Sequence, residues 1–167
     1  LVAGDDVVAT VDPVVETARY QRIQDLDLAD FDSAIVSTPD RSKIEILKYL
    51  LSNGKHVLVE KPMAIGLEQC DDMIAVAAAN GVKLMIGFTQ HYYGTSLKAK
   101  EILDSGELGP AITAVCYMSK NWGYKGRRPQ YRSRYHGGGM WLTNGVHVVD
   151  RLTWVMASQA VSVSASI

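Results

Sequence analysis

Short apolar runs alternate with amphipathic segments along the first ninety residues of the chain. Four runs, at residues 7–11, 33–38, 56–59 and 82–88, are almost continuously apolar or β-branched. Such runs are typical of strands that a parallel sheet buries on both faces. Because amphipathic segments follow the second and third runs, the pattern predicts βαβ units and an open, doubly wound parallel sheet.

Both of these connecting segments carry the signals of a helix with one buried face. After Pro39, Ser42 and Glu45 fit a capping box, and the Asn-Gly pair at 53–54 is a stop signal. The positions expected to face the core of this helix are Ile44, Leu47, Leu50 and Leu51. The second helix is predicted from about residue 67 to residue 80, with inward positions Met73, Ile74, Val76 and Ala77.

The second half of the chain has a different pattern. It predicts a helix over 96–103, a strand with one wet face over 111–120, and a loop rich in Tyr, Arg and Gly over 121–136. Three glycines at 137–139 precede another helix, whose apolar stripe is Val146, Val149, Leu152, Val155 and Met156. The alternating segment at 160–167 is typical of one strand of an antiparallel sheet, so an α+β domain is expected to begin here.

Composition narrows the class of protein. Of 167 residues, 47% are apolar and 21% are charged, which is a globular composition, and the net charge of −1 gives no support for nucleic acid as a partner. No apolar run approaches the roughly 20 residues that span a bilayer. The chain opens at Leu1 without a signal segment or initiator methionine, and we interpret it as a fragment. Cys70 and Cys116 are expected as free, buried thiols of a reducing compartment, by default the cytoplasm.

Polar residues follow the predicted strands where their carboxyl ends meet at one edge of the sheet. Doubly wound sheets bind ligands beyond this edge, so these residues are candidates for binding. No metal site is predicted. The candidates are Asp12, Ser37, Thr38, Pro39, Glu60, Lys61, Pro62 and Gln90.

Asp12 stands where a dinucleotide-binding fold has the carboxylate that hydrogen-bonds the adenosine ribose. A carboxylate there would repel the extra phosphate of NADP, which favours NAD and keeps NADP as the alternative. Asp12 and Pro13 fit a turn and helix cap equally well. The G-x-G-x-x-G loop that would cradle a pyrophosphate is not found in this chain.

Lys61 has a chemical interpretation at the same edge. A partly desolvated lysine near a positively charged nicotinamide ring would have a lowered pKa and could exchange a proton with a substrate hydroxyl. Pro62 would fix the backbone so that the lysine points into the cleft, and the Lys61-Pro62 bond could be cis. The alternative is an ordinary salt bridge at a strand end.

Two groups in the second half are candidates for substrate contacts. Tyr124 and Arg128 belong to the aromatic, arginine-rich loop, which can stack on and hydrogen-bond a sugar, with an interface loop as the alternative. His147 follows the glycine run and shares a helix face with Asp150, three residues further on. A structural histidine is the alternative there.

Six motifs follow one another along the chain: STPD (37–40), GKHVLVEKPMA (54–64), IGF (86–88), SGELG (105–109), GGG (137–139) and NGVHVVDRLTW (144–154). Their order resembles that of the Gfo/Idh/MocA oxidoreductases, the group of glucose-fructose oxidoreductase and inositol dehydrogenase. The resemblance implies a partial NAD(P)-binding Rossmann domain over 1–90. It also implies the beginning of a C-terminal domain over 91–167, built on a large, mostly antiparallel sheet through which the full-length protein would form homo-oligomers.

The resemblance further implies an NAD(P)-dependent dehydrogenase that acts on the CH–OH groups of sugars or polyols. By position, Asp12 would bind ribose, residues 37–39 would line the cofactor, and Glu60 would lie beside the nicotinamide. Lys61 would be the acid/base group, and His147 would contact the reacting oxygen.

Two positions depart from the family pattern. Thr143 replaces the aspartate of D-x-G-x-H, and Lys43 replaces a histidine that is common after the threonine-proline turn. Thr143 and Asn144 are therefore candidate substrate contacts beside His147, without the usual negative charge. Two other functions stay open, an enzyme that uses bound NAD transiently to cleave glycosides and a non-catalytic cofactor-binding or scaffold protein.

Overall fold

The computed structural model of the protein describes residues 7–119, 121, 126, 132–133 and 138–166. The chain divides into two compact units, residues 1–86 and residues 87–167. The predicted substrate contacts Tyr124 and Arg128 lie outside the described residues. A division into domains after residue 90 stays a prediction.

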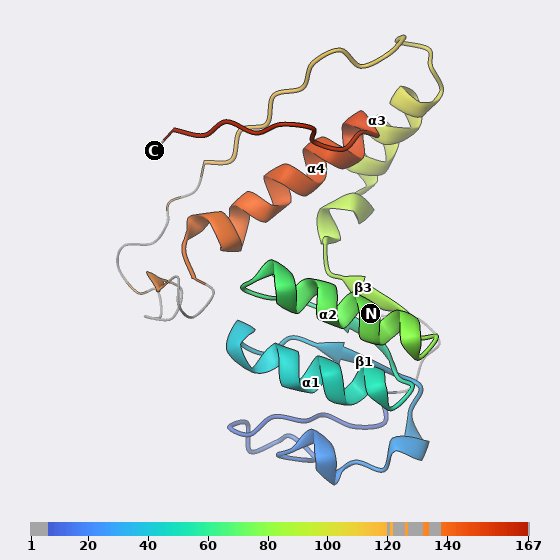
Figure 1. Cartoon of the computed structure of the whole chain (residues 1–167), viewed down its shortest axis with the longest axis vertical. Helices are drawn as coiled ribbons and strands as arrows, with labels where there is room; N and C mark the ends of the chain where they lie inside the picture. The colour runs from blue at the N-terminus through green and yellow to red at the C-terminus, as the bar shows by residue number, and fades with distance from the viewer. Residues whose placement is uncertain (1–6, 120, 122–125, 127–131, 134–137, 167) are drawn as a thin grey trace. The chain divides into compact units, whose positions relative to one another are not determined.

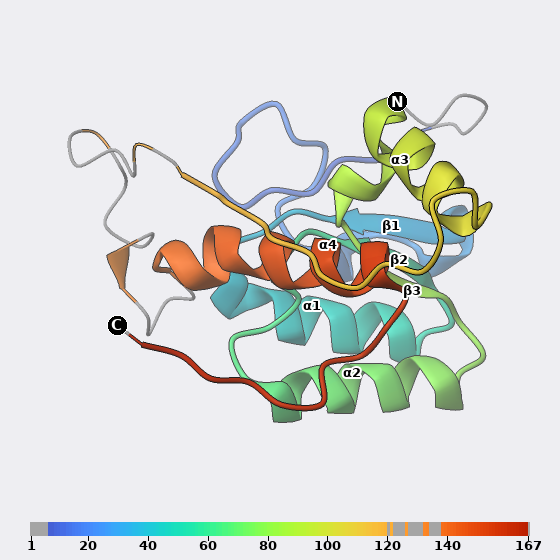
Figure 2. The ribbon, with the colours of Figure 1, turned by 90° about the horizontal axis from the view of Figure 1, so that it is seen from above.

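Unit 1 is built on a parallel sheet of three strands in the order β1-β2-β3. The strands are β1 (Ser33–Val36), β2 (His56–Val59) and β3 (Leu84–Ile86). Helix α1 (Asp40–Ser52) joins β1 to β2, and α2 (Leu67–Ala79) precedes β3. The two helices lie side by side on one face of the sheet (Figures 1 and 2). The predicted α/β architecture is confirmed for this part of the chain.

The core of unit 1 lies between the two helices and the sheet. Leu47, Leu50, Leu51 and Val59 are completely buried, as their helical and strand spacing requires. The prediction for Ile74 is wrong, because its side chain is 56% exposed while Met73 beside it is buried. On the other side of the sheet Ile35 is 66% exposed. Among the described residues of unit 1, the helices cover one face of the sheet, and Ile35 is not buried on the other face as the apolar composition of β1 predicts.

The sheet is one strand shorter than predicted. Residues 7–11 form no strand, and Val11 makes a single parallel bridge to Tyr20. Val7 is 83% exposed. An apolar run becomes a strand only where a neighbouring backbone supplies a ladder of hydrogen bonds, and the described residues supply one bridge here. The segment continues through two short 3₁₀ helices, Ile23–Asp25 and Leu28–Asp30.

Helix α1 begins three residues earlier than an N-cap at Ser42 would set it, because Pro39 is the N-cap residue. Ser42 is inside the first turn, where its hydroxyl donates to the carbonyl of Pro39 at 3.0 Å, so the predicted capping box is wrong. The stop at Asn53-Gly54 is confirmed, since Gly54 has φ of +75°. That left-handed conformation is one that glycine adopts without steric cost.

Unit 2 contains a 3₁₀ turn, η3 (Thr89–Tyr92), and helix α3 (Gly94–Asp104). Further on, a π-helical turn, η6 (Trp141–Gly145), continues directly into helix α4 (Val146–Met156). The predicted helices over 96–103 and after the glycine run are therefore confirmed. No helix in the described part of the chain is long and apolar enough to cross a membrane.

The predicted antiparallel strands are wrong for the described residues of unit 2. Neither 111–119 nor 160–166 forms a strand, although both alternate as strands do. Ile112 is 90% exposed, Tyr117 92% and Val161 99%. Alternation gives a segment one apolar face, but the hydrogen bonds of a strand come from a partner, and the described residues offer these two segments none.

Cys70 and Cys116 are free thiols, each partly exposed rather than buried. Burial, and then the carboxylate of Asp71, raises the pKa of the Cys70 thiol. The thiol form is therefore favoured.

Leu50→Ala is expected to lower the free energy of unfolding by about 2–5 kcal/mol, because it leaves a cavity in the completely buried core of unit 1. Leu67→Ala is the matched control, since Leu67 is 83% exposed, and its effect should stay within about 0.5 kcal/mol. Urea denaturation followed by far-UV circular dichroism measures both. Equal losses in the two variants would contradict this core.

Candidate functional site

The carboxyl ends of β1 and β2 bring two groups of predicted site residues together in unit 1. The N–H of Glu60 donates to the carbonyl of Val36 at 2.8 Å, so the strand pairing continues to the last residue of β1 and one step past β2. Residues 37–39 leave β1 at this point, and residues 60–62 leave β2. Parallel pairing therefore places these two segments at the same edge of the sheet, as predicted.

The segment that carries Lys61 is partly buried and internally bonded. The N–H of Lys61 donates to Oε2 of Glu60 at 3.2 Å. The Lys61-Pro62 bond is cis, one of the two isomers that the sequence allows. Met63 and Ala64, which follow, are buried at 5% and 6% exposure. Lys61 thus stands between a strand end and a buried segment.

Lys43 is the residue of this site that the sequence analysis missed as a contact. Its side chain is 2% exposed, and its Nζ donates to the carbonyls of Glu60 at 2.9 Å and Pro62 at 2.8 Å. Lys43 precedes the buried Leu47 by four residues and Leu50 by seven, so it lies on the inward face of α1. That spacing was a signal in the sequence that this lysine faces inward.

Thr38 has a buried hydroxyl at the same edge. Its Oγ1 has no hydrogen-bond partner in the described part of the chain. A buried hydroxyl without a partner is costly, and a polar ligand atom can satisfy it. This residue therefore fits the predicted cofactor edge.

Asp12 lies in a turn of the N-terminal segment. Its Oδ1 accepts hydrogen bonds from the N–H groups of Val14 at 2.8 Å and Val15 at 3.0 Å. These two bonds lower the pKa of the Asp12 carboxyl. The turn that the sequence offered as an alternative is thus present, and a role in ribose binding stays a prediction.

In unit 2 the predicted residues Thr143, Asn144 and His147 lie on η6 and the first turn of α4. Asn144 is 7% exposed and His147 is 8% exposed. The N–H of Thr143 donates to the carbonyl of Gly139 at 3.1 Å, and Gly139 has φ of +93°. π-helical turns are rare and often occur at functional sites, because they shift the side chains that follow.

The apolar stripe predicted for α4 is partly wrong. Val149 is 46% exposed, whereas His147, which is outside that stripe, is the buried residue of the helix. The inward face of α4 therefore includes His147 and excludes Val149.

Three aromatic rings connect His147 to the rest of unit 2. The ring of His147 meets Phe88 edge-on at 5.8 Å, and Phe88 stacks near His91 at 6.3 Å. His91 in turn stacks on Trp154 at 4.3 Å. Aromatic contacts of these geometries stabilise side-chain orientation as well as packing. No local pattern indicates a role for His91, because Asp150 and Trp154, two of its partners, are distant in the chain.

Asp150 does not bond to the histidine with which it shares a helix. Its Oδ2 lies 2.7 Å from Nε2 of His91. Gln90, a predicted cofactor contact, accepts a hydrogen bond from Nη2 of Arg151. These pairs join η3 to α4 within unit 2.

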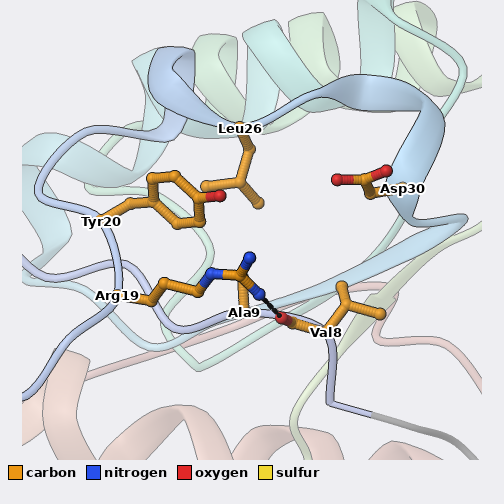
Figure 3. Close-up of a pocket in the computed structure, with 6 residues that line it drawn as sticks. All are labelled: Val8, Ala9, Arg19, Tyr20, Leu26 and Asp30. Carbon is orange, nitrogen blue, oxygen red and sulfur yellow. Dashed lines mark hydrogen bonds between the residues drawn. The ribbon is translucent and has the colours of Figure 1, made fainter.

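A separate pocket of about 170 Å³ lies in the N-terminal segment of unit 1 (Figure 3). The guanidinium of Arg19 crosses it and donates to the carbonyl of Val8 at 3.0 Å. None of the predicted site residues lines this pocket, which is formed by Val8, Ala9, Arg19, Tyr20, Leu26 and Asp30.

Histidine, cysteine and carboxylate side chains do not gather into a metal site anywhere in the described residues. The sheet edge of unit 1 offers a lysine amine and a threonine hydroxyl for chemistry, and the η6–α4 region of unit 2 offers a histidine ring and a threonine hydroxyl.

Comparison with known proteins identifies the chain. Residues 8–88 match the family model described as "Oxidoreductase family, NAD-binding Rossmann fold", and residues 96–167 match the "GFO/IDH/MocA C-terminal domain". The chain belongs to the Gfo/Idh/MocA oxidoreductase family. The predicted family and its Rossmann part are therefore confirmed.

Three curated relatives have similar levels of identity. The chain is 31% identical over 135 residues to 1-carboxy-3-chloro-3,4-dihydroxycyclohexa-1,5-diene dehydrogenase of Comamonas testosteroni, covering 81% of this chain and 34% of that protein. It is 28% identical over 135 residues to inositol 2-dehydrogenase 3 of Saccharopolyspora erythraea, covering 80% and 38%. It is also 28% identical over 120 residues to 2,7-anhydro-N-acetylneuraminate hydratase of Escherichia coli K12, covering 71% and 32%.

A solved structure supports the fold. A levoglucosan dehydrogenase in complex with NADH and levoglucosan matches with a TM-score of 0.66 at 21% identity, over 77% of this chain and 36% of that chain. This Gfo/Idh/MocA chain spans between 32% and 38% of the length of the three curated relatives.

Gly145→Ala is expected to destabilise unit 2 by about 1–3 kcal/mol, as overpacking does. A Cβ on Gly145 would lie 2.5 Å from Cε3 and 2.8 Å from Cδ2 of Trp141, so the indole or the π-helical turn must move. Gly94→Ala is the control, because no atom lies within 4 Å of its added Cβ. All three tryptophans lie in residues 87–167, so urea denaturation followed by tryptophan fluorescence reports on this unit. Equal midpoints would contradict the close contact with Trp141.

The carboxyl of Asp12 should titrate below its ordinary value of 3.8 in the folded protein, because Val14 and Val15 donate to its ionised form. The stability that these bonds give is fully present above that ordinary value, and it is lost as the pH falls through the lowered pKa. A ¹³C NMR titration measures the carboxyl in the folded chain and, as control, in urea. The same pKa in both states would show that the turn is absent in solution.

Proposed function

We propose that the protein is an NAD-dependent dehydrogenase that oxidises a CH–OH group of a sugar or polyol. The observation that carries the proposal is the shared sheet edge of residues 37–39 and 60–62, which lies inside the part that matches an NAD-binding Rossmann model. The names of two relatives, a dihydroxy-diene dehydrogenase and an inositol dehydrogenase, support an alcohol as the group oxidised.

The proposed cofactor contacts of unit 1 are residues 37–39 and Glu60 near the nicotinamide and Asp12 at the adenosine ribose. The buried Oγ1 of Thr38 would bond to the cofactor, Ser37 and Pro39 would line it, and Glu60 would lie beside its nicotinamide ring. Asp12 would contact the ribose through Oδ2, since Oδ1 accepts the bonds of its own turn. NAD, with NADP as the alternative, supplies the acceptor for hydride when it is bound.

Lys61 and His147 are the proposed catalytic residues. The amine of Lys61 would take the proton of the substrate hydroxyl as hydride leaves the same carbon, which is general base catalysis. His147 would hold the reacting oxygen through its ring, whose orientation Phe88 supports. Thr143 can hydrogen-bond the substrate but carries no charge, so the proton would move to Lys61 without a carboxylate at residue 143.

Substrate recognition is proposed for residues of unit 2. Asn144 is buried three residues before His147 in the chain, and its side-chain amide would bond a further hydroxyl. Tyr124 and Arg128 are proposed contacts from the aromatic loop, and Gln90 is a proposed cofactor contact. Assembly into a homo-oligomer is part of the same proposal.

A hydratase-type reaction is the second candidate. It is favoured by the relative named 2,7-anhydro-N-acetylneuraminate hydratase, which is as similar to the chain as the inositol dehydrogenase. Such an enzyme would consume substrate without net formation of NADH. The same residues would bind cofactor and substrate in both candidates.

Lys61→Met is expected to lower kcat of the full-length gene product by about 10²–10⁴-fold, since the general base is lost while an unbranched side chain of nearly the same length remains. The assay follows NADH at 340 nm with a panel of polyols and aldoses, and chromatography follows each substrate. Lys83→Met is the matched control, because Lys83 is an exposed lysine of the same unit, and it should retain full activity.

Four outcomes separate the candidates. NADH formed by the parent protein and lost in Lys61→Met supports the dehydrogenase. Conversion of a substrate without NADH, also lost in Lys61→Met, favours the hydratase type. A Lys61→Met variant that turns over at the parent rate would show that Lys61 is not the base, and no conversion of any substrate by the parent would favour a cofactor-binding scaffold.

A further inference from the structure

We propose that Lys43 is a positioning residue, whose buried ammonium group fixes the backbone on both sides of Lys61 and so holds Lys61 at the sheet edge. The proposal rests on the proposed function in so far as Lys61 is the catalytic base. The anchoring itself is a property of unit 1 and is measured separately from activity.

A lysine at this place has to be explained, because burying an ammonium group is costly unless hydrogen bonds compensate it. Lys43 is 2% exposed and shares the inward face of α1 with completely buried leucines. An apolar residue of similar length would fill the same space without that cost. The bonds that the ammonium group makes therefore indicate what it does.

The acceptors are the two carbonyls that flank Lys61. Nζ of Lys43 donates to Glu60 O at 2.9 Å and to Pro62 O at 2.8 Å. One donor group thus binds the residue before Lys61 and the residue after it. A single bond would leave the segment free to pivot about that point, whereas two bonds on either side of Lys61 fix its direction relative to α1.

Two further bonds complete the anchorage. Glu60 N–H donates to Val36 O at 2.8 Å, which ties the segment to β1. Lys61 N–H donates to Oε2 of Glu60 at 3.2 Å. The segment is thereby fixed to a strand on one side and, through Lys43, to a helix on the other. Catalytic groups need such support, since a small misplacement of a base lowers the rate strongly.

A role in stability alone makes a different prediction. If Lys43 only filled the core, its loss would weaken all of unit 1 evenly. If Lys43 positions Lys61, its loss would loosen residues 60–62 more than the strand that precedes them, and its effect on catalysis would depend on Lys61.

Amide hydrogen exchange on the chain tests the anchoring. In Lys43→Met, the amides of Glu60 and Lys61 should exchange at least about 10-fold faster than in the parent, while Val57 and Val59 of β2 change by less than about 3-fold. Lys48→Met, an exposed lysine of the same helix, is the control and should change neither. Even acceleration of all four amides, or no change at residues 60 and 61, would overturn the proposal.

Lys43→Gln serves if the methionine variant does not fold. Its amide donates hydrogen bonds but the side chain is one atom shorter, so it cannot reach both carbonyls as the ammonium group does. Exchange at Glu60 and Lys61 should then rise by at least about 3-fold over the parent, with Val57 and Val59 unchanged. Parent-like exchange at residues 60 and 61 would overturn the proposal as well.

A double-mutant cycle tests the link to Lys61 in the full-length gene product. Lys43→Met should lower kcat by at least about 10-fold with the KM for the cofactor unchanged, and it should have no further effect when Lys61→Met is already present. If the losses of kcat in the two single variants were additive in the double variant, Lys43 would not act through Lys61. Absence of activity in the parent would refute the proposed function, and the exchange measurement would still decide the anchoring.

Discussion

The parallel pairing of β1 with β2 is the interaction on which the rest of unit 1 depends. It brings the residues after each strand to one edge, and the bond from Glu60 N–H to Val36 O carries the pairing into the segment of Lys61. Helices α1 and α2 cover one face of these strands, α1 with completely buried leucines and α2 with the buried Met73 and Ala77. A packed core directly beneath this edge can hold the side chains of a site in place.

Buried polar side chains distinguish the sheet edge of unit 1 and the η6–α4 region of unit 2 from a purely apolar core. The buried polar side chains of the described residues are Lys43, Asn144 and His147, and each belongs to or adjoins a predicted site. Lys43 is compensated by the carbonyls of Glu60 and Pro62, and His147 is held in a series of ring contacts. Polar groups that a protein keeps buried at such expense are often tied to function, since apolar residues would pack there with less loss.

Sequence and structure agree where local chemistry decides the outcome. Gly54 ends a helix as predicted, and Leu47 and Leu50 are buried as helical spacing requires. The prediction and the structure differ where a strand needs a neighbouring backbone to form. The segments at 7–11, 111–119 and 160–166 have apolar patterns of strands but few or no hydrogen-bonding neighbours among the described residues. Ser42 fits a capping box in sequence, yet the helix begins earlier, at Asp40, because Pro39 takes the N-cap position.

By itself the sequence determined the family, the helices of both units, and the sheet edge that carries residues 37–39 and 60–62. These follow from periodicity, capping and the order of motifs, which are local properties of the chain. Only the tertiary structure decided that Lys43 binds the carbonyls around Lys61 and that Asp150 pairs with His91 rather than His147. Such partners are 17 to 59 residues apart, and no local pattern encodes a contact that packing alone creates.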